Sequence, residues 1–451
     1  MIRMLFIVAV LSIACGDDDS PVDASTALDT SNIDVFDTGP ACPPGFEPTP
    51  DGRACVLSPE FDGGAPEDAP EFDARDSEFD SGRVVTPPCV QRRASLLAHP
   101  DLIGWGARAA QASRNRTIVV TNLNSSGPGS FNDAIETDNA WVLVDPALDG
   151  GVINVSTNTT PGIATVYDGR DARLTLQQTT ANITIMSLNN SDNIIFNLGY
   201  RGMGQDVSGG GLRMNRGERY WAGNVEGWNF GDDCFSIGRS NDTDSARYAT
   251  WSCVYVHDTD KGLLLAGDNA ISQETGRAQF VTIHNSWLAA QDRNIRNSGF
   301  RRVHAFNNLS DGWSFGVMDA SHSASNRNGN SDGTLEASMF VQAGAYINPP
   351  ASGNTTAERG TVQTVTNANG STFVVPNYIY YDSANPSLYG AGVTPGSGNW
   401  IDIQAAGADL SFFDLPPYAY TLKDSAAVEA DVKAHAGLQS FNIDFCPEDA
   451  E

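Results

Sequence analysis

The chain has 451 residues, enough for two or three domain-sized units or one elongated domain with appendages, and it carries 55 Asp and Glu against 27 Lys and Arg. The resulting formal charge of −28 argues against a nucleic-acid partner held by electrostatic attraction. With 44 Gly, 23 Pro and only 18% charged residues, the composition favours turns and short strands and excludes long coiled coils and helical bundles.

The first segment, residues 1–14, has a short basic start followed by an apolar stretch that is too short to span a bilayer. This pattern predicts a secretory signal peptide. The segment ends in Leu-Ser-Ile-Ala directly before Cys15, and small residues before a Cys resemble the lipobox of bacterial lipoproteins. The resemblance implies lipidation of Cys15. We therefore expect an exported protein anchored through lipid to a bacterial outer membrane or cell surface; an ordinary signal peptide with an incidental Cys is the alternative.

The second segment, residues 15–88, is expected to be a disordered acidic tether. Residues 16–81 hold 18 Asp or Glu against Arg53 and Arg75, so 18 − 2 gives a net charge of −16 within the total of −28. Unbalanced charge with few apolar residues is typical of disorder. We interpret the segment as a solvated spacer, with the collection of calcium or other cations as the alternative.

The cysteines other than Cys15 are even in number, which in an exported protein favours disulfides. Six cysteines permit fifteen pairings, so the connectivity stays open. The hypothesis is three bridges, with the first closing a small turn-rich loop and the second clasping the ends of the body. The pairs are Cys42 with Cys55, Cys89 with Cys446, and Cys234 with Cys253.

The body, residues 89–451, consists of short β-rich segments divided by Asn, Gly, Asp and Ser. Markers in five of these segments recur at steps of 27, 29, 32 and 21 residues. Such a loose repeat predicts an all-β fold, a parallel β-helix with loop insertions, in which turn residues such as Asn307 and Asn308 stack or satisfy backbone groups. An antiparallel sandwich is the alternative. The markers are Ile194, Trp221, Thr250, Thr282 and Val303.

Several motifs in the body resemble those of the pectate and pectin lyases, which are right-handed parallel β-helices. The resemblance covers about Leu97 to Gly437, and it implies an extracellular enzyme that acts on an acidic plant polysaccharide, pectate or pectin; we expect a monomer. The motifs are Gly-Trp-Gly-Ala at 104–107, the segment 120–135, Asp-Lys-Gly-Leu-Leu-Leu-Ala-Gly at 260–267, the segments 281–285, 293–296 and 303–308, and Pro-Tyr-Ala-Tyr-Thr-Leu at 417–422.

The reaction that the resemblance implies is β-elimination. A base removes the weakly acidic proton at C5 of a uronate, and the oxygen at C4 of the same ring is expelled. The site must therefore neutralise the neighbouring carboxylate, by calcium, Lys or Arg, while charge builds up on it. By resemblance, Arg293 is the base, a role that requires an unusually low proton affinity for a guanidinium. Lys261 contacts a substrate carboxylate, and Arg296 neutralises another.

The calcium cluster of the family is only partly present. One carboxylate position falls on Gly210, and of a further pair only Asp232 or Asp233 is retained, with Ser236 or Ile237 opposite the other. Calcium prefers six to eight oxygen ligands. We therefore expect no tight family-type calcium site, and keep Asp232 and Asp233 as candidate calcium ligands.

The site departs from the family in other ways too, since Ile295 replaces the Pro of the Arg-x-Pro-x-x-Arg motif and Ser298 replaces its second Arg. Three explanations stay open. In the first, Arg213, Trp221 and Trp228 serve a less charged, methyl-esterified polymer. In the second, calcium arrives together with the substrate. In the third, the β-helix binds glycan without cutting it. A hydrolase built on Asp232 and Asp233 lacks the companion Asp motif that it needs.

Overall fold

The chain divides into two compact units, residues 1–83 and 84–451. In the first unit, β1 (Phe46–Pro48) pairs antiparallel with β2 (Cys55–Leu57). Among the residues described, no helix is both long and apolar enough to cross a membrane. The computed structural model describes residues 46–48, 55–57, 88–238, 247–266, 280–298, 302–314, 317–320, 337–366, 372–405 and 418–443.

Several expectations fall on parts of the chain that the structure does not describe. Cys15, Cys42 and Cys446 lie outside the described residues, and so do the side chains of Cys55 and Cys89. The lipidation of Cys15 and the first two disulfides therefore stay predictions.

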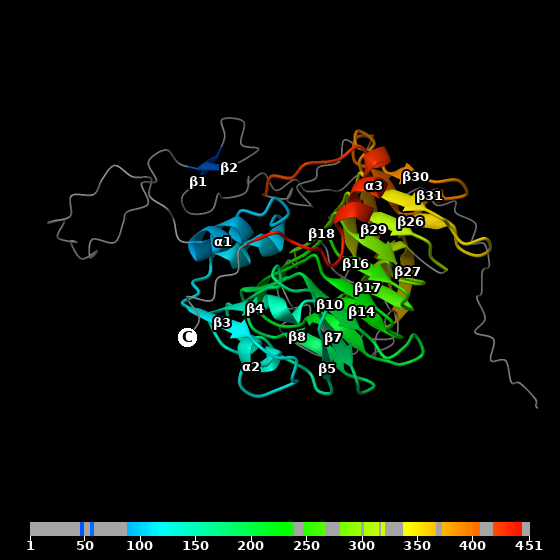
Figure 1. The fold of residues 1–451 in the computed structure, drawn as a ribbon. Coiled ribbons are helices and arrows are strands. Elements are labelled where there is room, and N and C mark those ends of the chain that lie inside the picture. Colours follow the sequence, from blue (N-terminus) through cyan, green and yellow to red (C-terminus); the bar gives the residue numbers. More distant parts are fainter. Residues whose placement is uncertain are drawn as a thin grey trace, which may run out of the picture. The chain divides into compact units, whose positions relative to one another are not determined.

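The second unit is a stack of coils (Figure 1). Within the described residues, its strands form three long sheets of nine, eight and eleven strands, and neighbouring strands in each sheet are parallel. Each complete coil adds one strand to each sheet, and the colours in Figure 1 pass along the stack from cyan through green to yellow. Crossovers between parallel strands are right-handed in nearly all proteins. The fold is the right-handed parallel β-helix that the sequence predicts, and the alternative of an antiparallel sandwich is wrong.

The nine-stranded sheet consists of β5 (Val152–Val155), β7 (Leu174–Gln178), β10 (Leu198–Arg201), β13 (Glu226–Trp228), β16 (Tyr255–His257), β19 (Trp287–Ala289), β22 (Leu309–Asp311), β25 (Ala345–Ile347) and β30 (Leu388–Tyr389). The eight-stranded sheet consists of β8 (Thr184–Leu188), β11 (Gly210–Met214), β14 (Asp233–Ile237), β17 (Lys261–Ala266), β20 (Ile295–Ser298), β23 (Met318–Ala320), β26 (Thr356–Gly360) and β31 (Thr394–Gly398).

The eleven-stranded sheet consists of β3 (Arg116–Val120), β4 (Ala140–Val144), β6 (Val166–Asp168), β9 (Asn193–Phe196), β12 (Glu218–Gly223), β15 (Arg247–Ser252), β18 (Phe280–His284), β21 (Arg302–Phe306), β24 (Ser338–Gln342), β29 (Tyr378–Tyr381) and β32 (Trp400–Asp402). An antiparallel hairpin joins β27 (Val362–Thr366) to β28 (Thr372–Pro376). The helices are α1 (Pro88–Leu97), η1 (Trp105–Gln111), α2 (Phe131–Ile135), η2 (Pro146–Leu148) and α3 (Ser425–His435).

The markers chosen from the sequence lie in one row of the eleven-stranded sheet. Ile194 is the register partner of Trp221, Trp221 of Thr250, and Thr250 of Thr282. The last marker is wrong by one residue, because Thr282 pairs with His304 and not with Val303. The repeat therefore reports true strand register over four coils.

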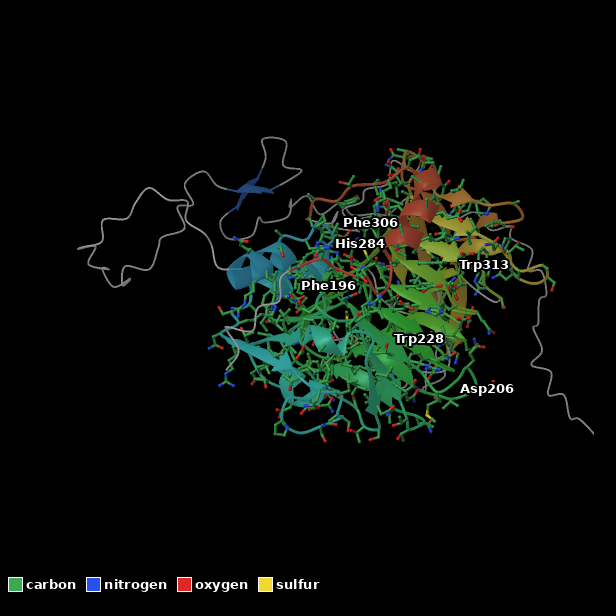
Figure 2. All side chains as sticks on the ribbon, in the orientation of Figure 1. Phe196, Asp206, Trp228, His284, Phe306 and Trp313 are labelled. Atoms are coloured by element: carbon green, nitrogen blue, oxygen red, sulfur yellow. The ribbon has the colours of Figure 1, made fainter. Side chains whose placement is uncertain are left out.

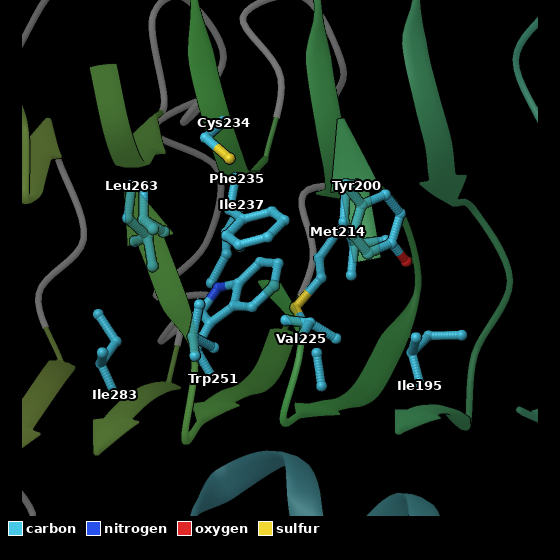
Figure 3. Close-up of a cluster of buried hydrophobic side chains, with 14 of the residues drawn as sticks. Ile195, Tyr200, Met214, Val225, Cys234, Phe235, Ile237, Trp251, Leu263 and Ile283 are labelled. Carbon is cyan, nitrogen blue, oxygen red and sulfur yellow. The ribbon is translucent and has the colours of Figure 1, made fainter. Parts of the chain in front are cut away.

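The interior of the stack is filled by apolar side chains from all three sheets (Figure 3). Phe235 of β14 stacks on Trp251 of β15, with ring centroids 5.0 Å apart, and packs edge-on against Tyr200 of β10. In parallel strands alternate side chains point to opposite faces. Gly227 of β13 points inward, since a Cβ there would lie 2.3 Å from the sulfur of Cys234. The residues on either side of Gly227 therefore point outward.

The Gly-Trp-Gly motif explains how the segment before the first strand covers the eleven-stranded sheet. The backbone N–H of Gly106 donates to Thr250 Oγ1 at 2.9 Å, and that of Trp105 donates to Thr282 Oγ1 at 3.1 Å. A Cβ on Gly106 would lie 1.8 Å from the carbonyl oxygen of Tyr220. Glycine is therefore required for η1 to lie this close to the strands. The row beneath η1 includes Trp221, which is fully buried.

The corner between the eleven-stranded and nine-stranded sheets has a recurring backbone conformation. Residues there have positive φ, which Asn tolerates better than most residues do. As predicted, Asn307 and Asn308 satisfy neighbouring groups: Asn307 Nδ2 donates to Asn285 Oδ1 at 3.2 Å, and Asn308 Nδ2 donates to the carbonyl of Ile283 at 2.9 Å. Cys253 occupies the equivalent corner position one coil before Asn285.

This placement overturns the proposed third disulfide. Cys234 and Cys253 are both buried free thiols. Cys234 packs in the interior beside Gly227, whereas Cys253 lies at the corner, in a different part of the coil. A disulfide needs Cα atoms within about 7 Å and Cβ atoms that point toward each other.

Candidate active site

The candidate site lies at the corner where the nine-stranded sheet leads into the eight-stranded sheet. Asp233 opens β14 and Lys261 opens β17, and the two are register partners. In the next coil, Lys261 forms an isolated parallel bridge with Asp292, the residue before Arg293. The stacking of coils therefore gathers residues that are separated by about thirty positions in the sequence.

Two ion pairs hold the predicted site residues together. The Arg293 guanidinium Nη1 donates to Asp233 Oδ1 at 2.8 Å, and Lys261 Nζ donates to Asp232 Oδ1 at 3.2 Å. Two further carboxylates belong to the cluster, since Asp260 Oδ2 lies 3.9 Å from Lys261 Nζ and Asp292 Oδ2 lies 3.6 Å from Arg293 Nε. We name these six residues the corner cluster: Asp232, Asp233, Asp260, Lys261, Asp292 and Arg293.

The backbone fixes the position of Arg293. Its φ is +56°, a left-handed conformation that costs a non-glycine residue energy. The carbonyl oxygen of Arg293 accepts a hydrogen bond from the N–H of Leu263 at 2.7 Å, and the N–H of Arg293 donates to Asp292 Oδ1 at 2.8 Å. A Cβ on Gly262 would lie 2.8 Å from that carbonyl oxygen. The glycine that follows Lys261 thus allows the two coils to meet closely at the site.

The ion pair between Arg293 and Asp233 sets the charge of both groups. Burial raises the pKa of Asp233 to about 6, against the opposing attraction of Arg293. Burial alone would lower the pKa of Arg293, but the Asp233 carboxylate outweighs it and the pKa is raised. Arg293 is therefore a cation in this arrangement.

Arg296 lies farther along the same face of the eight-stranded sheet. Its neighbours in β20 point into the core, so Arg296 points outward, and its Nε is buried without a hydrogen-bond partner in the described part of the chain. It belongs to an outward row that holds three arginines. The row consists of Ser187, Arg213, Ser236, Leu264, Arg296, Asp319, Arg359 and Ser397.

Two of these arginines have partners within the row. Arg213 Nε donates to Ser236 Oγ at 3.1 Å, and Arg359 pairs with Asp319 at 3.1 Å. Strands in a sheet are about 4.8 Å apart. The row therefore presents cations at spacings of about 10 to 15 Å along the face beside the corner cluster.

The residues present do not fit a family-type calcium site. Asp232 is paired with Lys261 and Asp233 with Arg293, so the nearest partner of each carboxylate is already a cation. No group of three His, Cys, Asp or Glu residues that would hold a metal occurs in the described ranges. Ser236 lies beside Arg213, and Ile237 is in the core. The further carboxylates of the corner cluster, Asp260 and Asp292, likewise lie beside Lys261 and Arg293.

The two tryptophans proposed for a less charged polymer have different environments. Trp221 is fully buried beneath the segment that contains η1 and stacks on Phe196, so its proposed contact with substrate is wrong. Trp228 is half-buried and points outward from β13. The sequence did not distinguish them because the segment that covers Trp221 comes from more than one hundred residues earlier.

Asp260 and Asp292 were not predicted from the sequence as members of the corner cluster. A signal was present, because each precedes a predicted cation at the same point of successive coils, in Asp260-Lys261 and in Asp292-Arg293. The register of the repeat would have placed the two pairs side by side.

Comparison with known proteins agrees with this architecture. A profile of the family described as "Pectate lyase" matches residues 129–441. The chain belongs to the pectate lyase family. Members of this family are polysaccharide lyases, and the match begins after β3 and includes the whole corner cluster.

Individual members of the pectate lyase family are more distant. A "Probable pectate lyase C" from Neosartorya fischeri is 26% identical over 356 residues, which cover 75% of this chain and 72% of that protein. One from Emericella nidulans is 42% identical over 69 residues, or 15% of each chain. Among solved structures, a Bacillus subtilis pectate lyase mutant has a TM-score of 0.45 at 15% identity, and covers 75% of this chain and 97% of that one. A Bacillus pectate lyase in complex with trigalacturonate has a TM-score of 0.44 at 14% identity, with 74% and 98% covered.

Proposed function

We propose that this pectate lyase family member cleaves a pectate- or pectin-type uronan by β-elimination. The observation that carries the proposal is the juxtaposition of Lys261 and Arg293 in successive coils, beside the outward row that contains Arg296. β-Elimination needs positive charge at the uronate carboxylate, so that charge can develop there as the C5 proton leaves. The corner cluster holds four carboxylates and two cations, so substrate must displace the ion pairs of Lys261 and Arg293 before their charge can serve it. Arg296, whose Nε has no partner in the described part of the chain, adds a third cation.

The proposed roles are those that the resemblance implies, and the positions of the side chains support those of Lys261 and Arg296. Lys261 presents a compact ammonium, and Arg296 a planar guanidinium that can hold a carboxylate through two parallel hydrogen bonds. Both would neutralise carboxylates of the bound chain. Arg293 is the proposed base at C5, and the ion pair with Asp233 is what substrate must displace for this role. Because Arg293 is a cation in the free protein, its loss of a proton must be driven by desolvation and by neighbouring Lys261 once the site is occupied.

Calcium enters the proposal only together with substrate. Carboxylates of a bound uronan would add oxygen ligands to Asp232 or Asp233, which alone are too few. No step of the reaction is assigned to calcium, because the nearest partners of both side chains are Lys261 and Arg293.

We propose further that the protein is exported and held at the surface of the cell by a lipid on Cys15. The support is the small residues Ser12 and Ala14 before Cys15 and the acidic composition of the following segment. The "Probable pectate lyase C" relatives come from fungi, so they lend no support to a bacterial lipoprotein. Mass spectrometry of Cys15 in membranes of an expressing bacterium tests the lipidation, and an unmodified N-terminus after signal cleavage would overturn it.

The experiment for the activity uses polygalacturonate and methyl-esterified pectin, each with and without calcium. The rise in ultraviolet absorbance of the unsaturated product reports β-elimination. Saturated reducing ends would indicate a hydrolase instead. Binding to uronans without any product would favour the second candidate, a glycan-binding β-helix descended from such lyases. That candidate is favoured by the raised pKa of Arg293, which disfavours its action as a base.

A further inference from the structure

The outward face of the nine-stranded sheet carries a row of side chains directly before the corner cluster. Trp228 of β13 lies between register partners Arg201 of β10 and His257 of β16. The neighbours of these residues along each strand, including Tyr200 and Gly227, point inward, so the row points outward. We name Arg201, Trp228 and His257 the flanking strip.

The flanking strip contains a rigid aromatic surface. The indole of Trp228 stacks on the imidazole of His257, with centroids 5.7 Å apart and planes inclined by 10°. His257 is fixed from both sides, since its Nε2 lies 3.1 Å from Glu226 Oε1 and its Nδ1 lies 2.8 Å from Asp258 Oδ2. Both carboxylates contact this ring, so a protonated His257 neutralises part of their negative charge.

One side of Trp228 is left without a partner. Within the described part of the chain, no second ring and no guanidinium lies over the other face of the indole, and the indole N–H makes no hydrogen bond. Arg201, on the neighbouring strand, is exposed, and no ion pair of its side chain occurs among the described residues. α3 and the segment after it cover a different row, that of Glu226, Tyr255 and Trp287.

The flanking strip and the corner cluster are connected across one corner. Trp228 precedes Asp232 by four residues, His257 precedes Lys261 by four, and Ala289 precedes Arg293 by four. Four residues span at most about 14 Å of chain. A polymer held at Lys261 and Arg293 that continues around the corner therefore reaches the strip. Figure 2 shows Trp228 among the green strands, away from Phe196, His284 and Phe306.

We propose that the flanking strip is an accessory binding site for a uronate residue of the polymer, outside the corner cluster. The sugar ring would place its apolar C–H face on the free face of Trp228, and its carboxylate would pair with Arg201. The proposal rests on the proposed function for the identity of the polymer. The strip would extend the contact with long chains and contribute nothing to short ones.

The test compares Trp228→Ala, Trp228→Phe and Arg201→Gln with the wild-type full-length chain. Arg116→Gln is the matched control, because Arg116 is an exposed arginine on β3 of the eleven-stranded sheet. The KM for polygalacturonate and the kcat/KM for trigalacturonate are measured, with unfolding curves to show that each variant is folded. For Trp228→Ala we expect KM for the polymer to rise about 3- to 10-fold, the range that loss of one aromatic contact produces. Cleavage of trigalacturonate should be unchanged, and Trp228→Phe should restore most of the affinity.

Arg201→Gln separates the ligand classes. It should raise KM for polygalacturonate but not for highly methyl-esterified pectin, in which the carboxylates are blocked. An equal rise in KM on both polymers for Arg201→Gln overturns the accessory site. So does an unaltered KM for polygalacturonate in Trp228→Ala or in Arg201→Gln. If the wild-type chain cleaves no uronan, the proposed function itself has failed, which is a distinct result. Retained cleavage with unaltered KM in both variants would reject only the strip.

Discussion

The Arg293 guanidinium donates a 2.8 Å hydrogen bond to the Asp233 carboxylate, which lies two coils earlier in the stack. This ion pair joins a residue assigned to proton removal with one assigned to calcium. The Asp233 carboxylate thus holds the Arg293 guanidinium at the corner cluster.

The first prediction concerns Arg293. Arg293→Ala should lower kcat on polygalacturonate by at least about 100-fold, the size expected for loss of a general base. Arg293→Lys keeps the positive charge but not the fork of donors, and should remain strongly impaired. Arg116→Ala is the control and should be fully active. Lyase activity of Arg293→Ala within a few-fold of wild type would remove Arg293 from the chemistry.

A second prediction separates charge neutralisation from proton removal. Lys261→Met should raise KM for polygalacturonate and lower kcat, since the ammonium faces a carboxylate that gains charge in the transition state. The effect should be smaller on methyl-esterified pectin, which lacks that charge. Lys433→Met, on α3, is the matched control. The measurement is the ratio of kcat/KM for the two substrates, and a ratio that does not change would contradict the role of Lys261.

Calcium gives a third prediction. Because the Asp232 and Asp233 carboxylates are each paired with a cation, we expect no tight calcium binding by the chain without substrate. Isothermal titration of calcium into the free protein, and into an Asp233→Asn variant, checks this. A dissociation constant in the micromolar range that is lost in Asp233→Asn would mean that calcium displaces Arg293 unaided.

A fourth prediction concerns Glu358, which is fully buried near the far end of the stack. Glu358 accepts a hydrogen bond from Trp400 Nε1 at 2.7 Å and another from the Tyr389 hydroxyl at 3.3 Å. Both of these donors are neutral groups. Burial raises the pKa of Glu358. The folded chain thus holds the proton more tightly than the unfolded chain, whose carboxyl titrates near 4.5. The protonated Glu358 carboxyl therefore contributes its full stabilisation below pH 4.5. This contribution is lost as the pH rises through the pKa of Glu358 in the folded chain.

Urea unfolding measured between pH 4 and pH 8 tests this sign. Glu358→Gln cannot ionise, so its stability should fall less than that of wild type as the pH rises over this range. Glu136→Gln, at an exposed position, should follow the wild-type curve. A Glu358→Gln curve parallel to wild type would show that the buried carboxyl does not titrate.

The fifth prediction addresses the contact between η1 and the strands. Gly106→Ala puts a Cβ 1.8 Å from the Tyr220 carbonyl oxygen, so η1 must move and lose its hydrogen bond to Thr250. We expect a loss of about 1–3 kcal/mol in the free energy of unfolding, as for other overpacked sites. The control is Gly312→Asn, where φ is +77° and the nearest atom is 3.8 Å away. An unchanged urea midpoint for Gly106→Ala would show that η1 is not held by this approach.

The fold could be predicted from the sequence because the spacing of similar residues along the chain reflects the register of the strands in the β-helix. Ile194, Trp221, Thr250 and Thr282 lie in one row because each coil returns the chain to the same face. Val303 missed this row by one residue, because the coil returns the chain to the row at His304. The same register brings Lys261 next to Asp292, the residue before Arg293.

What the sequence did not predict depends on the directions of side chains and on distant segments. The pairing of Asp233 with Arg293 requires two side chains to reach across two coils, which spacing does not specify. The burial of Trp221 depends on a segment that precedes the repeat. The free thiols of Cys234 and Cys253 follow from their positions at separate parts of the coil, whereas an even count of cysteines carries no positional information.

The two hydrogen bonds that Trp105 and Gly106 donate to Thr282 and Thr250 span 177 and 144 residues of sequence. At ordinary rates of synthesis, about 5–20 residues per second, roughly ten to thirty-five seconds pass between the emergence of Trp105 and that of Thr282. During this time the Trp105 ring has not met Phe280, against which it packs with centroids 4.2 Å apart. The nascent chain therefore cannot bury Trp105 in its native position before the middle of the protein has been translated.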